Sequence, residues 1–393
     1  MKVLMTVDAV GGVWTYAVTL CRALVPHGVE VVLACMGPPP APQQGAAVLD
    51  LPNVRIYVSD CRLEWMPCAD GATWADVDRA GAWLLALAER HRVDVAHLNG
   101  YSHAALPWRC PVLVVAHSCV LSWWQAVHGT APPPAWDEYR ERVARGIAAA
   151  TAVVAPSRFM LQEIARLYGA SPHHALPFTT VIPNGSELAA PAARQHTPPG
   201  SAERQKFVMA CGRMWDEAKN LRALDEAAVG LPWPVYIAGP TVFAGHGAVR
   251  CRAAVPLGPL AHSHLIGWLR RAAIFAHPCL YEPFGLAPLE AALAGCPLVL
   301  GDVPSLRELW SDAATFIEPR DPDALHDALL ELMAMTNRRQ QMARAAWARA
   351  QSLTPGRMAA QYASLYQRLV AHHVPAGRAT HFDHESRDAR QDR

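Results

Sequence analysis

Residues 1–35, MKVLMTVDAVGGVWTYAVTLCRALVPHGVEVVLAC, contain the pattern that decides the fold. The apolar run 3–7 is typical of a buried strand, and two glycines follow it as a turn. The amphipathic stretch 14–25 predicts a helix that a glycine ends, and the apolar run 29–35 predicts a second strand. A strand, a crossover helix and another strand form one βαβ unit, so we expect the two strands to lie parallel in one sheet.

The same alternation continues in two series along the chain, which predicts an α/β architecture. In the first series we expect strands at 54–58, 95–98, 112–116, 152–155 and 180–182, and helices at 76–90, 136–148 and 158–168. In the second series we expect strands at 207–211, 235–238, 274–276, 298–300 and 315–317, and helices at 221–228, 263–271, 287–294 and 304–309. Three helical stretches close the chain.

A composition break separates the two series. Residues 189–205 are rich in Ala, Pro, Gln and Arg and have no apolar period, which is typical of a linker. We therefore expect two Rossmann-like, doubly wound domains that face each other across a cleft, with ligands beyond the carboxyl ends of the strands. The expected division is 1–188 for the N-terminal domain, 189–205 for the linker, 206–354 for the C-terminal domain, 355–372 for a last helix and 373–393 for a polar tail that we expect to be disordered.

The composition of the 393 residues excludes several classes of protein. Apolar residues make up 52% and charged residues 18%, which excludes wholesale disorder. The net charge is +1, so we expect no nucleic-acid partner. No apolar run approaches the ~20 residues that cross a bilayer, and residues 1–8 read as a strand rather than as a signal peptide. We expect a cytoplasmic protein, and peripheral contact with a membrane is left open.

Cysteine and histidine are frequent but scattered. The chain has 10 cysteines and 18 histidines, and none of them shows the spacing of a zinc site. Most cysteines stand in apolar runs, as buried reduced cysteines do. We therefore expect no metal site built from these residues.

The stretch 281–297, YEPFGLAPLEAALAGCP, carries the densest functional signal. A predicted strand leads into this loop, and a helix follows the loop. The free amides around Phe284, Gly285 and Leu286 point at whatever lies before that helix. Such a helix start favours a phosphate group through its unpaired N–H groups and its dipole.

Two carboxylates in the same stretch are candidates for binding hydroxyl groups. Glu282 is expected in the loop and Glu290 about one turn into the helix, so both can face the cleft and accept hydrogen bonds from a sugar. The alternative is that Glu290 is a helix residue favoured by the dipole and that Glu282 is a solvated loop charge.

The loop 212–221, GRMWDEAKNL, places two cations between a predicted strand and a predicted helix. Arg213 offers a planar fork for paired oxygens and Lys219 offers a compact ammonium, and together they suit a diphosphate. Asn220 has the character of an N-cap for the helix that follows. The alternative is a pair of surface cations satisfied by the two acidic residues between them.

Three further features lie in the first half of the chain. Gly11 and Gly12 permit close approach of a ligand to the backbone, although they lack the Gly-x-Gly-x-x-Gly fingerprint, and a plain βα turn is the alternative. His117 stands where a predicted strand ends, as an active-site residue or a structural histidine. Trp123 and Trp124 fit either the core, which we favour, or an aromatic platform for an acceptor.

Taken together in this order and spacing, these stretches resemble family 4 of the retaining glycosyltransferases, which have the GT-B fold. The resemblance runs from residue 2 to about residue 370. Its most specific parts are 212–220 and the Glu-x₇-Glu pattern from Glu282 to Glu290. The segments VAPS at 154–157 and VIPNG at 181–185 also look like the pattern of the family.

The resemblance implies that a nucleotide-activated sugar lies in the cleft, mostly on the C-terminal domain. It implies that Arg213 and Lys219 hold the diphosphate with the amides of Gly285 and Leu286, and that Gly12 approaches it from the other domain. It also implies that Glu290 binds the ribose and that Glu282 binds hydroxyls of the transferred sugar. His117 would lie beside the anomeric carbon. The acceptor would bind mainly on the N-terminal domain, and the last helix would cross back to that domain.

The activity that the resemblance implies is retaining, metal-independent transfer of a hexosyl unit from a nucleoside-diphosphate sugar. No metal or other cofactor is expected, because Arg213, Lys219 and the helix amides take its place. The acceptor is left open among a glycan, a lipid-linked molecule and a small molecule, and so are the base (UDP, GDP or ADP) and the oligomeric state. The runner-up is a two-domain protein that binds a nucleotide sugar or a sugar without turnover. A nicotinamide-dependent oxidoreductase would need the glycine fingerprint that is missing here.

Overall fold

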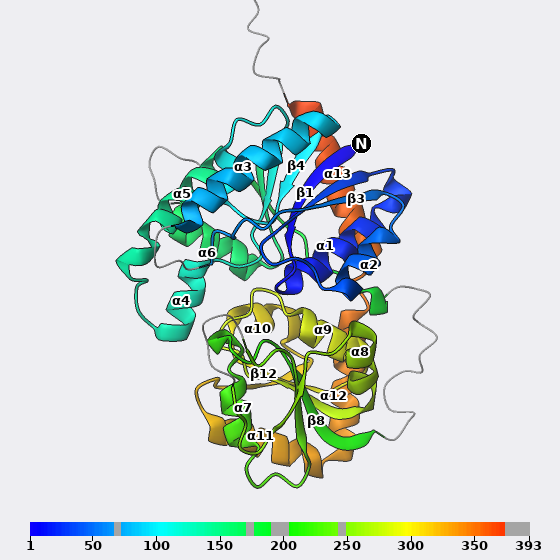
Figure 1. Ribbon diagram of the computed structural model, residues 1–393. Helices are drawn as coiled ribbons and strands as arrows, with labels where there is room; N and C mark the ends of the chain where they lie inside the picture. Colours follow the sequence, from blue (N-terminus) through cyan, green and yellow to red (C-terminus); the bar gives the residue numbers. More distant parts are fainter. Residues whose placement is uncertain (67–71, 170–176, 190–203, 243–248, 374–393) are drawn as a thin grey trace, which may run out of the picture.

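The computed structural model describes residues 1–66, 72–169, 177–189, 204–242 and 249–373. The chain forms two lobes, one above the other in Figure 1, and each lobe is built around one parallel sheet. The two Rossmann-like, doubly wound α/β lobes confirm the predicted fold class. Of the expected linker, 190–203 lies outside the described residues, as does all of the expected tail except its first residue, so the expected division into domains stays a prediction.

The N-terminal lobe has a seven-stranded sheet in the order β3-β2-β1-β4-β5-β6-β7. Its strands are β1 (Lys2–Asp8), β2 (Glu30–Met36), β3 (Val54–Val58), β4 (Val95–Leu98), β5 (Val112–Val115), β6 (Ala152–Ala155) and β7 (Phe178–Val181). Its helices are α1 (Gly12–Ala23), α2 (Pro42–Leu49), α3 (Ala72–His91), α4 (Val120–His128), α5 (Asp137–Ala149) and α6 (Arg158–Tyr168). The central strands are continuous apolar runs because helices cover both faces of the sheet.

The C-terminal lobe repeats this topology with six strands in the order β10-β9-β8-β11-β12-β13. Its strands are β8 (Gln205–Cys211), β9 (Val235–Ala238), β10 (Val255–Gly258), β11 (Ala272–His277), β12 (Leu298–Gly301) and β13 (Ala314–Ile317). Its helices are α7 (Leu221–Ala227), α8 (His262–Arg271), α9 (Leu286–Leu293), α10 (Pro304–Trp310), α11 (Pro322–Ala334) and α12 (Thr336–Ala350).

Three elements were absent from the sequence-based expectation, namely α2, α4 and β10. The edge strand β10 contains a proline, and its first two residues are exposed, so its apolar pattern is weak. Helix α4 combines two tryptophans with a half-buried face, and only the left-handed Gly129 at its end (φ 68°) is an ordinary helix signal. No helix among the described residues is both long and apolar enough to cross a membrane.

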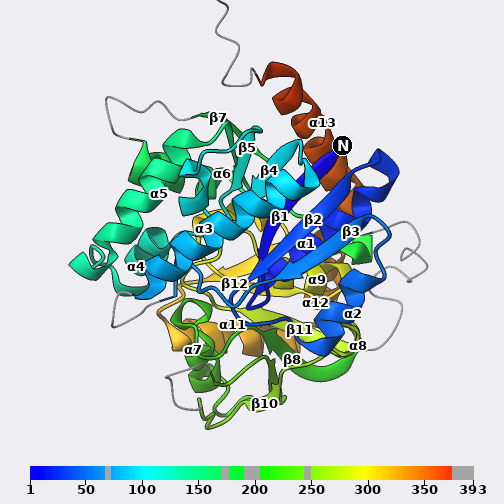
Figure 2. The same cartoon turned by 45° about the horizontal axis from the view of Figure 1, so that its top comes forward.

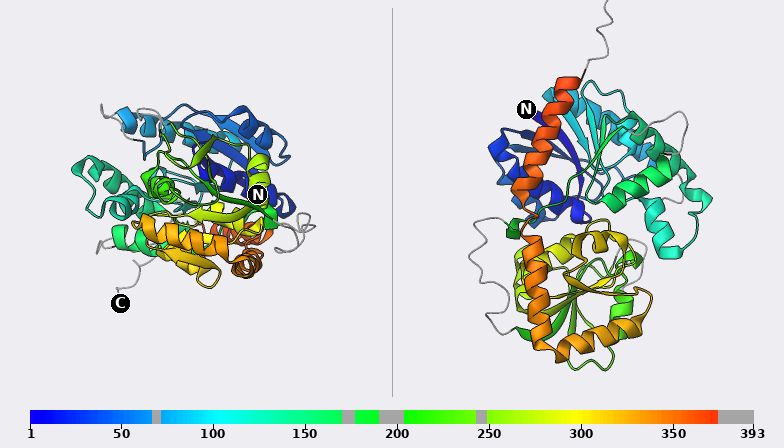
Figure 3. Two further views of the ribbon diagram at one scale, coloured as in Figure 1. Left: turned by 90° about the horizontal axis from the view of Figure 1, so that it is seen from below. Right: turned by 180° about the vertical axis from the view of Figure 1, so that it is seen from behind.

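The last helix, α13 (Pro355–His372), packs on the first lobe. In Figure 3, α12 lies along the lower lobe, and α13 continues from it onto the upper lobe. Met358, Tyr362 and Tyr366 of α13 are buried in the same apolar cluster as Val3 and Leu20. The N-terminal core is therefore completed by residues from the end of the described chain.

The strand orders locate the place where a ligand binds in such sheets. In the first sheet β1 has β2 on one side and β4 on the other, and in the second sheet β8 has β9 and β11 as its neighbours. The crossover connections turn in opposite directions on the two sides of β1 and of β8, which opens a crevice at their carboxyl ends. Figure 2 shows both sheets with these edges turned toward the boundary between the lobes.

Candidate active site

A cleft of about 1040 Å³ lies between the two lobes. Its N-terminal wall includes the chain after β1, β4 and β5, and its C-terminal wall includes the loops after β8 and β11. The predicted site residues that line it are Gly12, His117, Arg213, Lys219, Glu282, Phe284, Gly285 and Leu286. Residues from separate parts of the sequence therefore meet in one cleft, as parallel sheets that face each other predict.

Arg213 crosses the cleft toward the N-terminal lobe. Its guanidinium donates a hydrogen bond from Nη2 to Oδ2 of Asp216 at 2.6 Å and lies over the ring of Trp215, 5.2 Å from its centre. A Cβ added to Gly11 would lie 2.6 Å from Nη1 of Arg213, so any side chain at this position would require the guanidinium to shift. The Nε atom of Arg213 is buried and has no hydrogen-bond partner among the described residues. The side chain is held on one side and keeps a donor unused.

Lys219, Glu282 and His277 form a buried polar cluster. The Nζ atom of Lys219 lies 2.7 Å from Oε2 of Glu282, and Nε2 of His277 lies 3.1 Å from the same oxygen. The side chains of Lys219 and Glu282 are 17% and 12% exposed. Lys219 is therefore paired with a carboxylate from another loop. The alternative of two surface cations satisfied by the two acids between them is wrong for Lys219, whereas Arg213 does pair with Asp216.

The charges in this cluster stabilise one another. Burial alone would raise the pKa of Glu282, but the ammonium of Lys219 and the hydrogen bond from His277 outweigh it and hold the pKa well below its usual value. Burial alone would lower the pKa of Lys219, but Glu282 reverses the sign, so the net shift is upward. Burial lowers the pKa of His277, so its imidazole is neutral at pH 7 and donates from Nε2. The cluster is thus a charged pair with a neutral donor beside it.

The start of α9 faces the same cleft. Gly285 precedes the helix with φ 92°, a left-handed backbone that a side chain would strain, and its carbonyl accepts from the amide of Leu289 at 3.1 Å. The first amides of a helix have no partner within the helix. A Cβ on Gly12 would lie 3.4 Å from Cδ1 of Leu286, so the two lobes meet at this point. The geometry suits an anion between the lobes.

Glu290, which was expected to face the cleft, is the one predicted site residue that is absent from the described lining of the cleft. Its carboxylate is buried on α9, and Oε1 lies 2.8 Å from Nε2 of His262 at the start of α8. The hydrogen bond to Glu290 outweighs burial and raises the pKa of His262. His262 was missed from the sequence because the two residues are 28 positions apart and no local motif joins them.

His117 belongs to a hydrogen-bond chain that runs through the N-terminal lobe. Its Nε2 lies 2.9 Å from Oδ1 of Asn99, and Nε2 of His97 lies 3.2 Å from the same oxygen. Nδ1 of His97 lies 2.6 Å from the hydroxyl of Tyr366 on α13. Asn99 donates its amide to the carbonyl of Thr6 at 2.6 Å, which fixes Oδ1 as the acceptor. Both histidines therefore donate from Nε2, and Nδ1 of His117 is an acceptor.

Burial keeps both of these histidines neutral. It lowers the pKa of His117 to about 3. Burial, together with the repulsion that protons on both neighbouring rings would cause, also lowers the pKa of His97 to about 3. An imidazole with such a pKa carries no charge at physiological pH. His117 can accept a hydrogen bond in the cleft, but it does not act as a proton donor from a charged imidazolium there.

The carboxylate of Asp216 connects the loop after β8, which carries Arg213 and Lys219, to helix α4. Asp216 is buried, accepts from Arg213 on Oδ2, and accepts on Oδ1 from the indole of Trp123 at 3.2 Å. Trp123 and Trp124 are half-buried and line the cleft, although Trp123 also packs against the core. The two tryptophans therefore belong to the cleft wall rather than to a closed core.

Asn220 differs from its expected role. It stands at the N-cap position of α7, but its side chain makes no cap and its backbone is left-handed, with φ 51°. Its amide instead donates to the carbonyls of Pro278 at 2.9 Å and Pro319 at 2.6 Å. Asn220 thus fixes the loop that carries Lys219 to the loops after β11 and β13.

No group of three or more His, Cys, Asp or Glu side chains within the described residues is arranged to hold a metal ion. Nine cysteines are present in this part of the chain, and all of them are free. That sugar transfer by this chain needs no metal ion stays a prediction.

Comparisons with known proteins agree on one family. The family model described as "Glycosyltransferase Family 4" matches residues 10–189, and the model described as "Glycosyl transferases group 1" matches residues 257–349. The D-inositol 3-phosphate glycosyltransferase of Xylanimonas cellulosilytica is 28% identical over 376 residues, which cover 85% of this chain and 86% of that protein. The glycogen synthase of Mycobacterium tuberculosis is 31% identical over 207 residues, covering 48% and 47% of the two chains.

Solved structures show the same fold at lower identity. The sucrose-phosphate synthase of Thermosynechococcus elongatus superimposes with a TM-score of 0.76 at 19% identity, covering 94% of this chain and 99% of that chain. The Anabaena protein HepE in complex with UDP-glucose superimposes with a TM-score of 0.70 at 18% identity, covering 94% and 100%. At this identity the likeness speaks for the arrangement of the two lobes alone.

Proposed function

The chain belongs to the family 4 glycosyltransferases of the GT-B fold, and from this premise we propose that it transfers a hexosyl unit from a nucleoside-diphosphate sugar with retention of configuration and without a metal ion. The observation that carries the proposal is the meeting of Arg213, Lys219 and the start of α9 in one cleft. Names of relatives add support, since HepE was solved with UDP-glucose.

The chemistry follows from where negative charge develops. As the bond between the anomeric carbon and the diphosphate oxygen breaks, the leaving group gains charge, and fixed cations there lower the barrier. Arg213 has an unused Nε donor, and Lys219 is buried beside the start of α9. Both groups are already positioned, so little reorganisation is needed during the reaction.

Glu282 has two tasks in this proposal. Its carboxylate holds the ammonium of Lys219 in place and stays ionised, so it can accept hydrogen bonds from hydroxyls of the transferred sugar. Glu290 would accept from the ribose, on condition that the nucleotide shares or displaces the hydrogen bond from His262. Gly12 and the amides of Phe284, Gly285 and Leu286 would approach the diphosphate from both lobes.

Retention is assigned without a protein nucleophile. Both carboxylate oxygens of Asp216 are engaged, by Arg213 and Trp123, and Oε2 of Glu282 is engaged by Lys219 and His277, so we assign neither residue as a nucleophile. His117 is neutral and suits a hydrogen-bond acceptor that orients the sugar. The acceptor hydroxyl then forms the new bond to the anomeric carbon on the face that the diphosphate leaves, and its proton passes to the departing phosphate oxygen.

The test is a thermal-shift screen of the purified chain against UDP, GDP and ADP, followed by their sugars. We expect one diphosphate to raise the unfolding temperature with a saturable dose dependence, because it binds the folded state alone. NMR of the transfer product then reports the anomer, and dialysis against EDTA reports the need for metal. Inversion at the anomeric carbon, or activity lost with EDTA and restored by a divalent cation, would contradict those parts of the proposal.

The alternative of a binding protein without turnover makes a different prediction. Such a protein would retain the nucleotide sugar unchanged in the presence of every acceptor and of water. Arg213, Lys219 and Glu282, to which the proposal gives roles in transfer, all line the cleft. Release of free nucleoside diphosphate from the sugar donor distinguishes the two functions in one assay. A cytoplasmic location stays a prediction.

A further inference from the structure

The N-terminal wall of the cleft is rich in aromatic side chains. Six of them line it within the described residues: Trp65, Tyr101, Trp123, Trp124, Trp136 and Tyr139. The indole rings of Trp123 and Trp124 are half-buried neighbours on α4, with centres 6.3 Å apart. Large apolar rings that remain partly exposed inside a cleft are ready to cover a ligand.

These rings are held in place. The indole of Trp123 donates to Asp216 at 3.2 Å, and the ring of Trp124 lies 4.3 Å from that of His128, one turn along the helix. Behind them, the amide of Val120 at the start of α4 donates to the hydroxyl of Tyr139 at 3.3 Å. The platform of Trp123 and Trp124 is therefore anchored on both lobes, which reduces the entropy that a ligand must overcome.

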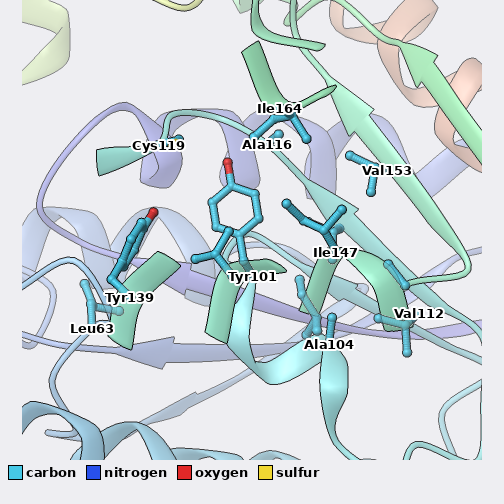
Figure 4. Packing of buried hydrophobic residues seen from close by; sticks show 14 of the residues in the cluster. Leu63, Tyr101, Ala104, Val112, Ala116, Cys119, Tyr139, Ile147, Val153 and Ile164 are labelled. Carbon is cyan, nitrogen blue, oxygen red and sulfur yellow. The ribbon is translucent and has the colours of Figure 1, made fainter. Parts of the chain in front are cut away.

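The N-terminal wall of the cleft also carries the buried acid Glu64. Glu64 accepts from the amides of Tyr101 at 2.9 Å and Ser102 at 2.8 Å, and its carboxylate lines the cleft. The hydroxyl of Tyr101 donates to the carbonyl of Ser118 at 2.7 Å. Figure 4 shows Tyr139 beside Leu63 and the hydroxyl of Tyr101 directed toward the segment that carries Ala116 and Cys119. These contacts join the loop of Glu64 to the segment that carries His117.

The charge of this wall limits what it can bind. Among the described residues of the N-terminal lobe that line the cleft, Arg62 is the sole Lys or Arg, and its Nε lies 3.9 Å from a carboxylate oxygen of Asp76. Glu64 adds a negative charge nearby. A phosphate group on this side would meet a like charge and a cation that is already paired, which disfavours it.

We propose that Trp123 and Trp124 form the platform of the acceptor subsite, and that its occupant is an uncharged sugar ring. A pyranose has a face of C–H bonds that stacks on the negative face of an indole. Its several hydroxyl groups can donate hydrogen bonds to the carboxylate of Glu64. A purely aromatic acceptor has fewer hydroxyl groups to donate to this carboxylate. The proposal rests on the proposed transferase function and names the class of acceptor for that same cleft.

The experiment measures binding and transfer separately. The full chain is saturated with the nucleoside diphosphate that stabilises it, and saturation-transfer NMR then measures the binding of the methyl α-glycosides of glucose, mannose and galactose, their 6-phosphates, and 4-nitrophenol. We expect a neutral glycoside to bind more tightly than its 6-phosphate and than 4-nitrophenol. Steady-state transfer with the matching sugar donor gives the acceptor KM.

Variants of the platform locate the binding. Trp124→Ala should raise the acceptor KM about tenfold, the value of one aromatic contact, while Trp124→Phe keeps it within about threefold. Trp347→Ala, which removes a half-buried tryptophan from α12 in the other lobe, is the matched control and should leave it unchanged. Calorimetric affinity for the diphosphate should be the same in all three variants.

Several results would overturn the acceptor assignment. They are a 6-phosphate or 4-nitrophenol that binds more tightly than every neutral glycoside, an unchanged acceptor KM in Trp124→Ala, and the absence of glycoside binding by a chain that binds the diphosphate. Absence of diphosphate binding in the unsubstituted chain, with glycoside binding retained, would instead count against the donor function alone. The two proposals therefore fail in different measurements.

Discussion

The two walls of the cleft use different kinds of side chain for different tasks. The C-terminal wall presents Arg213 and Lys219, each in contact with a carboxylate. The N-terminal wall presents the tryptophans of α4 and also His117, whose imidazole is kept neutral by burial. Cations stand where a leaving group would gain charge, and neutral rings stand where a neutral molecule would be held. Asp216 connects the two walls, because its carboxylate accepts hydrogen bonds from Trp123 of the N-terminal lobe and from Arg213 of its own lobe.

The largest effect is expected from removing a cation of the charged wall. Lys219→Ala should lower the rate of transfer on the order of 10²-fold or more, because a fixed charge near the leaving group is lost. The rate is measured as release of nucleoside diphosphate at saturating donor and acceptor. Near-normal turnover in this variant would contradict the proposal that the cations of the C-terminal wall stabilise the leaving group.

A smaller effect is expected from the carboxylate that holds this cation. Glu282→Ala should lower transfer between about tenfold and a hundredfold, because hydrogen bonds to the transferred sugar and to Lys219 are both lost. The affinity for the plain nucleoside diphosphate should stay within a few fold, since the ammonium remains. Calorimetry that found a large loss of diphosphate affinity would place Glu282 at the nucleotide instead.

The contact of Arg213 with Gly11 sharpens the comparison at the point where the walls meet. Gly11→Ala should displace the guanidinium, because the new Cβ would lie 2.6 Å from Nη1, and weaken diphosphate binding by about fivefold. Gly267→Ala on α8 is the matched control, because a Cβ there meets nothing within 4 Å. Equal diphosphate affinity in the two variants would show that Arg213 is free to move aside.

The last effect concerns stability and leaves transfer at pH 7 unchanged. Burial lowers the pKa of His97 from 6.5 to about 3, so between these values the unfolded chain binds a proton that the folded chain does not. Stability should therefore fall as the pH falls, by about 2 kcal/mol from this residue at pH 5. Urea unfolding at pH 7 and pH 5 measures the change, and NMR titration of the imidazole identifies its source. A midpoint near 6.5 for His97 would show that burial does not lower the pKa of this imidazole.

Much of this molecule is readable from the sequence because local pattern and global fold agree. Most strands of both sheets are apolar runs bounded by glycine or polar residues, so their existence follows from the pattern, whereas the edge strand β10 lacks such a run. Arg213, Lys219 and Glu282 were found because they lie on loops at the carboxyl ends of strands. Their meeting in one cleft follows from the topology, while their roles stay predictions.

The rest depends on contacts between distant segments. The indole of Trp123 bonds Asp216 across 93 positions, and His262 bonds Glu290 across 28, and neither pair has a local signature. Asn220 looks like a cap in the sequence, yet tertiary acceptors at Pro278 and Pro319 compete for its amide. Side chains with several polar partners are therefore the least predictable parts of the site.

The docking of α13 on the first lobe has a consequence for how the protein is made. On the ribosome, the first sheet emerges long before Tyr362 and Tyr366, so its apolar face must wait uncovered while the second lobe is synthesised. The hydroxyl of Tyr366 also supports His97 and, through Asn99, His117. A nascent chain thus completes the hydrogen-bond chain to His117, which we propose orients the sugar, only after its final helix has been released. Premature termination before that helix would leave this histidine without the support of Tyr366.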